Sequence, residues 1–163
     1  MHLYFMRHGL ATWPANTHFA DDSERPLTEA GLQLLRAAST GLARRLTAGQ
    51  PRPDAILCSP LLRARQTAEI MAQALTPARP ADPHAWLRPG FDIPLLDALI
   101  SERPTAGALL LVGHNPDMME IVSALTHRDV RFREGTVAHV QRRPAGRAQL
   151  VWSATAEELA AQA

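Results

Sequence analysis

Three short apolar runs constrain the fold of this chain more than any other feature of its sequence. They occupy residues 3–6 (LYFM), 55–58 (AILC) and 108–112 (ALLLV). None of them alternates between polar and apolar positions, and this pattern is typical of strands in a parallel sheet that is covered on both faces. Stretches with helical character separate the runs. The sequence therefore predicts a three-layer α/β/α sandwich with a mostly parallel central sheet.

Capping signals predict where the helices of this sandwich begin. Thr28 is a suitable N-cap for a helix in which leucines recur at helical spacing as far as Leu46. Ser59 is followed by a proline, the signature of an N-cap and a first helical position, and predicts a helix to about residue 75. Asn115 is also followed by a proline and predicts a helix to about residue 126.

The remaining segments give weaker signals. Further strands are expected over residues 130–133, 136–142 and 147–153, the last two as a hairpin across residues 144–146, and a weak helix over residues 155–163. Residues 77–94 carry five prolines and are expected to form an irregular internal connection. Since 163 residues is a usual length for one domain, a single domain over residues 1–163 is expected.

The basic residues restrict the chemistry that is open to the chain. All 17 of them are arginine, and lysine is absent. This excludes a lysine-dependent P-loop and Schiff-base chemistry. With 16 acidic residues the formal net charge is only +1, so there is no electrostatic signature of a nucleic-acid-binding protein.

The cysteine count and the hydropathy pattern indicate a cytoplasmic protein. Cys58 is the only cysteine, so neither an internal disulfide nor a thiolate zinc cluster can form, which fits a reducing compartment. No apolar run approaches the roughly 20 residues that span a bilayer, and the N-terminal run is too short for a signal peptide. The histidines lack metal-binding spacing, so neither a metal nor another cofactor is expected.

Polar side chains follow each of the three apolar runs. Arg7, His8 and Gly9 come directly after the first, Arg63 lies near the start of the helix after the second, and His114 follows the third. Because ligands of open parallel sheets bind beyond the carboxyl ends of the strands, these side chains are expected to converge. Two helix N-termini would add N–H donors there. Such a site suits a tetrahedral dianion.

Direct attack by a histidine on phosphorus is the reaction that this set of residues favours. Metal-assisted phosphoryl transfer has little support without a lysine or a carboxylate cluster. A histidine among arginines can instead form a covalent phosphohistidine, since the guanidinium groups neutralise phosphoryl charge and oppose protonation of the ring. His8, beside Arg7, is the better candidate for the nucleophile. Gly9 would let the backbone turn closely around the phosphate.

Four motifs resemble those of the histidine phosphatase superfamily, in the branch that includes the phosphoglycerate mutases. They are RHG at residues 7–9, LTEAG at 27–31, SPLLRARQTA at 59–68 and VGHNP at 112–116, and they occur in the family's order. The resemblance implies a phosphoglycerate mutase-like fold in which His8 is the nucleophile. It also implies that Arg7, Arg63 and His114 hold the phosphoryl group.

The short chain and the segment LRPGFD at residues 87–92 are most similar to the SixA-type phosphohistidine phosphatases. This similarity implies hydrolysis of phosphohistidine in proteins. Mutase-like relatives carry a glutamate general acid, but Trp86 stands about where that acid is expected, and Asp92 is the nearest carboxylate. A missing acid suits a P–N bond, because imidazole is a better leaving group than an alkoxide. The segment after RHG also departs from the mutases, since LATW at residues 10–13 replaces small polar residues.

Other functions remain open at this point. The chain could be a phosphomonoesterase for small phosphorylated molecules, or a non-catalytic module that binds phosphoproteins. A cysteine phosphatase is disfavoured, because five residues must separate its cysteine from its arginine, whereas four separate Cys58 from Arg63 and six separate it from Arg65. Arg25 is expected to support a turn. The other histidines are expected to be surface or structural residues: His2, His18, His84, His127 and His139.

Overall fold

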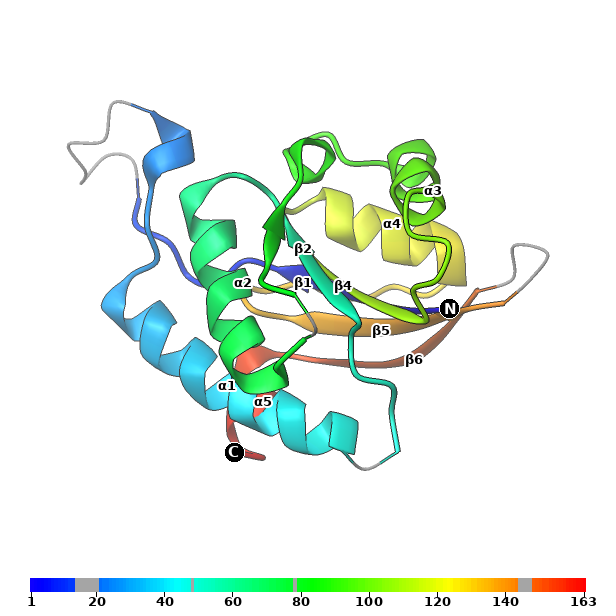
Figure 1. The fold of residues 1–163 in the computed structure, drawn as a ribbon. Helices are drawn as coiled ribbons and strands as arrows, with labels where there is room; N and C mark the ends of the chain where they lie inside the picture. The colour runs from blue at the N-terminus through cyan, green and yellow to red at the C-terminus, as the bar shows by residue number, and fades with distance from the viewer. Residues whose placement is uncertain (14–20, 48, 78, 144–147) are drawn as a thin grey trace.

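The computed structural model describes residues 1–13, 21–47, 49–77, 79–143 and 148–163, and its architecture is an α/β/α sandwich (Figure 1). The central sheet has six strands in the order β3-β2-β4-β1-β5-β6. The strands are β1 (His2–Arg7), β2 (Ala55–Cys58), β3 (Asp82–Pro83), β4 (Ala108–Gly113), β5 (Val137–Arg142) and β6 (Ala148–Ala154). The first four are mutually parallel, and β5 pairs antiparallel with both β1 and β6. The predicted fold class is confirmed.

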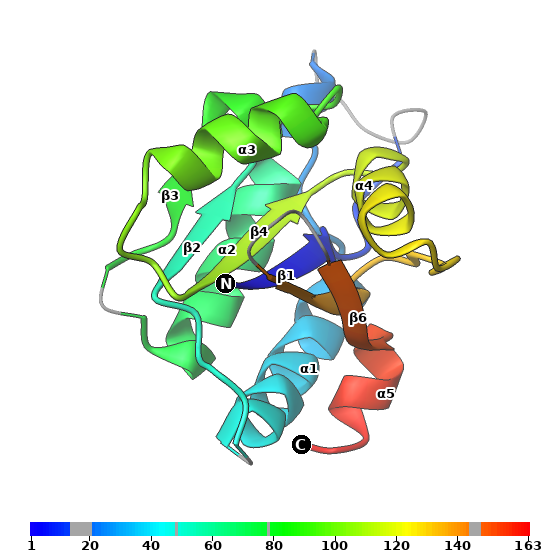
Figure 2. The same ribbon diagram turned by 90° about the vertical axis from the view of Figure 1, so that its right-hand side faces the viewer.

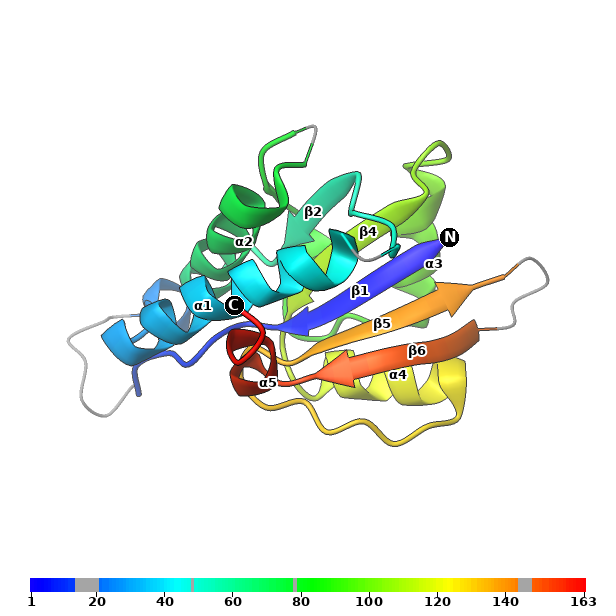
Figure 3. The ribbon, with the colours of Figure 1, turned by 90° about the horizontal axis from the view of Figure 1, so that it is seen from below.

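Helices cover both faces of the sheet (Figures 2 and 3). On one face lie α1 (Glu29–Thr47), α2 (Leu62–Leu75) and α5 (Ala156–Ala160), and on the other lie α3 (Ile93–Ser101) and α4 (Asp117–Thr126). Two short 3-10 helices, η2 (Asp22–Glu24) and η3 (Ala85–Leu87), complete the elements. Within the described ranges, none of the helices combines the length and the apolar character needed to cross a membrane.

The strands are buried on both faces, as their continuous apolar runs predict. In β1, Tyr4 and Met6 join the core beneath α1 and α2, whereas Leu3 and Phe5 join the core beneath α3 and α4. All four side chains are at most 1% exposed. Every residue of β4 is buried as well. The burial of both faces explains why polar residues are absent from these runs and appear only where the strands end.

The capping predictions are confirmed for α1 and wrong for α2. Thr28 caps α1, because its Oγ1 accepts a hydrogen bond from the Gly31 N–H at 3.0 Å. Helix α2 begins at Leu62, three residues beyond Ser59. The Ser59 hydroxyl accepts a hydrogen bond from the Leu61 N–H and also contacts the ring of His114. It therefore stabilises the turn before the helix and does not cap the helix itself.

The predicted cap of α4 is also displaced. The helix begins at Asp117, and Pro116 occupies the N-cap position without a side-chain cap. The Asn115 side chain instead donates a hydrogen bond to the Phe132 carbonyl oxygen at 2.9 Å. It therefore ties the start of α4 to a distant segment, and this tertiary contact replaces the local one that the sequence suggests.

Two of the three predicted C-terminal strands and the predicted C-terminal helix are confirmed. Strands β5 and β6 pair antiparallel, and Thr155 forms a capping box with Glu158 at the start of α5. The turn predicted at residues 144–146 lies outside the described residues. The strand predicted over 130–133 is wrong: this segment has no ladder partner, although Val130 and Phe132 are buried in the core. Its backbone is used differently, because the Phe132 carbonyl accepts side-chain hydrogen bonds.

The irregular connection predicted over residues 77–94 contains more structure than expected. It includes β3 and η3, and its last proline, Pro94, lies in the first turn of α3. Asp92 is the N-cap of this helix, since its Oδ1 accepts a hydrogen bond from the Leu95 N–H at 3.0 Å. Proline is well tolerated in the first helical turn, so Pro94 begins a helix where the prediction had a loop.

The contact between α1 and α5 gives a stability prediction. A Cβ atom at Gly41 would overlap the Leu159 carbonyl oxygen of α5. Gly41→Ala should therefore lower the free energy of unfolding by about 1–3 kcal/mol, although alanine normally stabilises a helix relative to glycine. Urea denaturation measures the change. Thr40→Ala, an exposed neighbour on α1, is the matched control and should be neutral or slightly stabilising. An unchanged or increased stability of Gly41→Ala would contradict the packing described here.

Candidate active site

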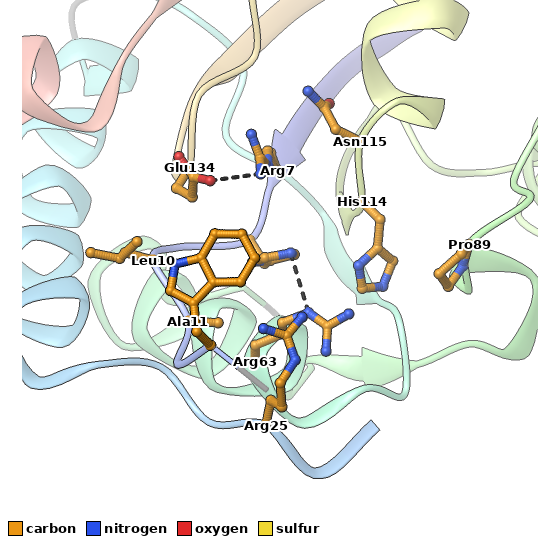
Figure 4. Close-up of a pocket in the computed structure, with 11 residues that line it drawn as sticks. Arg7, Leu10, Ala11, Arg25, Arg63, Pro89, His114, Asn115 and Glu134 are labelled. Atoms are coloured by element: carbon orange, nitrogen blue, oxygen red, sulfur yellow. Dashed lines mark hydrogen bonds and ion pairs between the residues drawn. The ribbon is translucent and has the colours of Figure 1, made fainter. Parts of the chain in front are cut away.

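The four predicted phosphoryl-binding side chains meet at the carboxyl ends of β1, β2 and β4 (Figure 4). They line a pocket of about 240 Å³ and are Arg7, His8, Arg63 and His114. Arg7 is the last residue of β1, His8 and His114 directly follow β1 and β4, and Arg63 lies in the first turn of α2. The structure therefore brings together the residues that the strand ends and motifs single out.

His8 is held in one tautomer by two hydrogen bonds. Its Nδ1 lies 2.7 Å from the Gly9 carbonyl oxygen, which can only accept, so Nδ1 carries the proton. Its Nε2 receives a hydrogen bond from the Arg63 Nε–H at 3.2 Å, so Nε2 carries the lone pair. Gly9 itself packs against α1, where a Cβ would collide with Leu35, and its N–H donates to Thr67. The arrangement leaves a basic nitrogen at the pocket.

The electrostatics of the pocket keep His8 neutral. Burial lowers the pKa of His8 to about 4, and the positive charges of Arg63 and Arg7 act in the same direction. The Gly9 carbonyl and the Glu134 carboxylate oppose this shift and do not overcome it. At neutral pH the ring is therefore an unprotonated base or nucleophile. This is the state that the arrangement of arginines around the histidine predicts.

His114 faces His8 across the pocket. The two rings are 5.2 Å apart between centroids and meet edge to face at 61°. Burial lowers the pKa of His114 to about 3, and repulsion from His8 and Arg63 contributes. Its Nε2 lies 2.8 Å from the Ser59 Oγ, which fixes the ring. His114 is therefore a neutral, anchored hydrogen-bonding group beside the candidate nucleophile.

Arg7 is oriented by a carboxylate and by a backbone carbonyl. Its Nη2 forms an ion pair with Glu134 at 2.6 Å, and its Nη1 donates to the Phe132 carbonyl oxygen at 3.0 Å. The Nε–H is buried and finds no hydrogen-bond partner among the described residues. A buried guanidinium donor without a partner is costly unless a ligand satisfies it. Arg7 is thus held in place at the pocket by Glu134 and the Phe132 carbonyl.

Arg63 is oriented by Asp22 of η2. Its two terminal nitrogens donate to the Asp22 backbone and side-chain oxygens at 2.8 and 2.9 Å. Asp22 also pairs with Arg25, at 2.7 Å. Burial would raise the pKa of Asp22, but the hydrogen bonds and charges of the two arginines outweigh it and lower that pKa. Arg25 therefore supports the site through Asp22, as a turn residue that also lines the pocket.

Sequence reasoning missed the two carboxylates at the site. Glu134 lines the pocket directly, and Asp22 reaches it through Arg63. The only local signal was the spacing of three between Asp22 and Arg25, which allows a side-chain pair in a helical turn. Asp92, the carboxylate considered as a substitute acid, caps α3 and does not line the pocket. That expectation is not supported by the geometry.

The remaining sequence candidates have other surroundings. Trp86 packs on the ring of His84 and against the core beneath α3. Burial raises the pKa of the Cys58 thiol to about 12, so it is not a thiolate nucleophile at neutral pH. His139 is buried and stacks on Tyr4, which is a structural position. His18 lies outside the described residues. Across the part of the chain that is described, no three or more His, Cys, Asp or Glu side chains are grouped to hold a metal ion.

Comparison with known proteins identifies similar sequences and structures. The family model "Histidine phosphatase superfamily (branch 1)" matches residues 3–88, just over half of the chain. An uncharacterized protein of Picosynechococcus is 39% identical over 127 residues, which cover 77% of this chain and 73% of that protein. The phosphohistidine phosphatase SixA of Escherichia coli is 29% identical over 156 residues, covering 93% and 92%. A solved structure of the protein histidine phosphatase SixA complexed with tungstate superposes with a TM-score of 0.82, at 26% identity over 98% of this chain and 99% of that one.

The depressed basicity of His8 can be measured directly. NMR of protein labelled with ¹⁵N-histidine should show His8 as the neutral Nδ1–H tautomer from pH 8 to about pH 5, because its pKa is about 4. Arg63→Gln should raise this pKa, since it removes a nearby positive charge. The same difference in pKa affects the stability of the fold, because the histidine of the unfolded chain titrates near 6.5. The contribution of the neutral His8 ring to the free energy of unfolding is therefore present above pH 6.5 and is lost as the pH falls towards 4. Titration of His8 near 6.5 in the folded protein would contradict the described electrostatics.

Proposed function

Because the chain belongs to branch 1 of the histidine phosphatase superfamily, we propose that it is a metal-independent phosphohistidine phosphatase that uses a covalent phosphohistidine on His8. The observation that carries this proposal is the state of His8: a neutral ring, with its Nε2 lone pair at a pocket that also presents Arg7, Arg63 and His114. These are the groups that attack on phosphorus requires: a nucleophile, and positive charge for the phosphoryl oxygens. Residues 1–163 are proposed to form one catalytic domain.

The proposed reaction has two displacements at phosphorus. In the first, the His8 Nε2 lone pair forms a bond to phosphorus as the bond to the leaving group breaks, and the electron pair of that bond remains on the leaving nitrogen. In the second, water attacks the phosphohistidine, inorganic phosphate forms, and the electron pair of the broken P–N bond returns to Nε2. The Gly9 carbonyl holds the Nδ1 proton through both steps, so Nε2 stays the reacting atom.

Phosphoryl oxygens are proposed to bind the guanidinium groups of Arg7 and Arg63 and the ring of His114, all of which line the pocket. In the absence of substrate, the Arg63 Nε–H donates a hydrogen bond to the Nε2 of His8 at 3.2 Å, which is long for a charge-assisted hydrogen bond. This hydrogen bond therefore breaks at little cost when the phosphorus atom approaches Nε2. Glu134 and Asp22 keep the two guanidinium planes in position through this exchange. Each good charge-assisted hydrogen bond to the phosphoryl group contributes about 1.5–3 kcal/mol.

The state of the carboxylates supports phosphohistidine rather than a phosphate ester as the substrate. An alkoxide leaving group needs a proton from a general acid, and a general acid works best with a pKa near the working pH. The pKa of Asp22 is lowered by its arginine partners, and Glu134 is engaged in an ion pair with Arg7. An imidazole leaving group needs less help, because a ring whose other nitrogen already carries a proton departs as neutral imidazole. The names of the SixA relatives, which refer to phosphohistidine and to protein histidine, agree with this choice.

The proposed setting is the cytoplasm, with a phosphorylated protein as the partner. The thiol of Cys58 is buried, and burial raises its pKa. A chain with a single cysteine has no internal disulfide, which suits a reducing compartment. The near-neutral net charge gives no reason to expect nucleic acid as a partner. A role in signal transduction would follow if the phosphohistidine belongs to a signalling protein.

The nucleophile is tested by substitution and by trapping. His8→Ala should lower the rate of dephosphorylation by about a thousandfold or more, because it removes the atom that bonds to phosphorus. Rapid quenching at alkaline pH followed by mass spectrometry should place a phosphoryl group on His8 of the native protein. Cys58→Ala is the control for the rival nucleophile and should keep its activity. Phosphate on another residue, or turnover by a folded His8→Ala protein, would refute the assignment.

The substrate class is tested by comparing rates on a phosphohistidine peptide and on a panel of aliphatic phosphomonoesters. The peptide should have a kcat/KM at least about a hundredfold higher, because the carboxylates described at the site, Glu134 and Asp22, are both paired with arginines and are not free to protonate an alkoxide. EDTA in every assay should leave the rates unchanged, since no step uses a metal. Preference for an ester would support a small-molecule phosphatase, absence of turnover on all substrates would indicate a binding module, and inhibition by EDTA that a divalent metal reverses would refute the metal-free mechanism.

A further inference from the structure

The mouth of the pocket carries an exposed tryptophan. Trp13 lines the same pocket as the catalytic candidates, yet 75% of its surface is exposed. It is the most exposed of the large hydrophobic side chains in the described residues, and Leu10, exposed by 44%, lines the pocket with it. Isolated apolar side chains are common on protein surfaces, but a large aromatic side chain at the opening of a charged pocket suggests contact with a ligand.

The backbone that carries this side chain is anchored on the residues before it. Ala11 forms an antiparallel bridge with Leu27. The Thr12 N–H donates to the Pro26 carbonyl oxygen at 3.0 Å, and the Thr12 carbonyl oxygen accepts from the Arg25 guanidinium. Arg25 in turn pairs with Asp22, which binds Arg63. The position of Trp13 is therefore tied by successive contacts to an arginine of the phosphoryl site.

An indole ring can contribute little to holding a phosphoryl dianion. It carries no charge, and its π face is the negative part of its quadrupole, which favours cations and flat rings. The phosphoryl group already has Arg7, Arg63 and His114. The part of a substrate for which an indole face is suited is therefore the leaving group. In a phosphohistidine this group is an imidazole, a flat aromatic ring. When its other nitrogen carries a proton the phosphorylated ring is cationic, and it leaves as neutral imidazole because the electron pair of the broken P–N bond stays on it.

We propose that Trp13 is a specificity residue that stacks on the imidazole of the substrate phosphohistidine and so selects phosphorylated rings over ringless phosphoryl donors. The inference rests on the function proposed above and adds the residue that recognises the leaving group. The apolar segment that replaces small polar residues after the RHG motif thereby has a role in substrate choice.

The test compares two substrates that share a P–N bond and differ in the ring. One is a glycine-flanked phosphohistidine tripeptide, and the other is phosphoramidate, which has no ring. For Trp13→Ala the ratio of kcat/KM for the tripeptide to kcat/KM for phosphoramidate should fall by about tenfold, the size expected for loss of an aromatic or cation–π contact. Trp13→Phe, which keeps a π face, should hold the ratio within about threefold. Val151→Ala, which removes an exposed apolar side chain on β6, is the matched control and should leave it unchanged.

A second readout separates recognition of the ring from a general effect on the pocket. Free imidazole should inhibit the native protein competitively against the tripeptide, and its inhibition constant should rise about tenfold in Trp13→Ala. A ratio that stays constant, or an equal loss on both substrates, would overturn the role of Trp13. A loss that appears only with a whole phosphoprotein would also overturn it, because Trp13 would then contact the protein surface. If the native protein turns over phosphoramidate but not the tripeptide, the proposed function itself fails. This outcome is measured on the native protein alone and so is distinct from any effect of the Trp13 variants.

Discussion

The parallel pairing of β1 with β4 is the interaction on which the site depends. Arg7 is in register with Gly113, and the His8 N–H continues the ladder by donating to the Gly113 carbonyl oxygen at 3.0 Å. The next residue in each strand is a histidine, so the end of one ladder brings His8 and His114 to 5.2 Å between ring centroids. Parallel strands run in the same direction, so their carboxyl ends lie at the same edge of the sheet. A fold that paired these two strands antiparallel would place the histidines at opposite ends of the sheet.

The charges of the site are balanced so that the arginines are held without being neutralised completely. Arg63 is only 5% exposed, and a buried guanidinium without a partner would be costly. Asp22 and Glu134 offset the charge of the two arginines and fix their planes, but both carboxylates are themselves more than one-third exposed. Their interactions are therefore weakened by solvent, and a phosphoryl dianion can compete for the same donors. This arrangement favours binding of the dianion together with release of the phosphate product.

The parts of the molecule that the sequence predicted share a physical origin. Buried parallel strands leave continuous apolar runs, and the side chains at their ends, such as His8 and His114, must lie at one edge of the sheet. The missed features depend on contacts between distant segments. Glu134 reaches Arg7 across the end of the sheet, and no periodicity records that pair. Asn115 binds the Phe132 carbonyl instead of capping α4, so a local capping signal was outweighed by a tertiary hydrogen bond. Helix α3 was missed because Pro94, at its start, also resembles a loop residue.

In the proposed mechanism, catalytic chemistry and substrate choice are supplied by different segments of this chain. The nucleophile and its charged neighbours come from strand ends and the start of a helix, where backbone hydrogen bonds limit movement to a small range. The residues proposed to face the leaving group come from the segment after the RHG motif, which contributes Leu10, Ala11 and Trp13 to the pocket. On this proposal, changes in that segment would alter which leaving group is stabilised without moving Nε2 of His8, because Gly9 and Arg63 fix the tautomer of its ring. The described residues that line the pocket include one carboxylate, and it is paired with Arg7. That lack of a free acid and the exposed indole are then two aspects of one proposed adaptation: a leaving group that needs little protonation gains more from a surface on which its ring can stack.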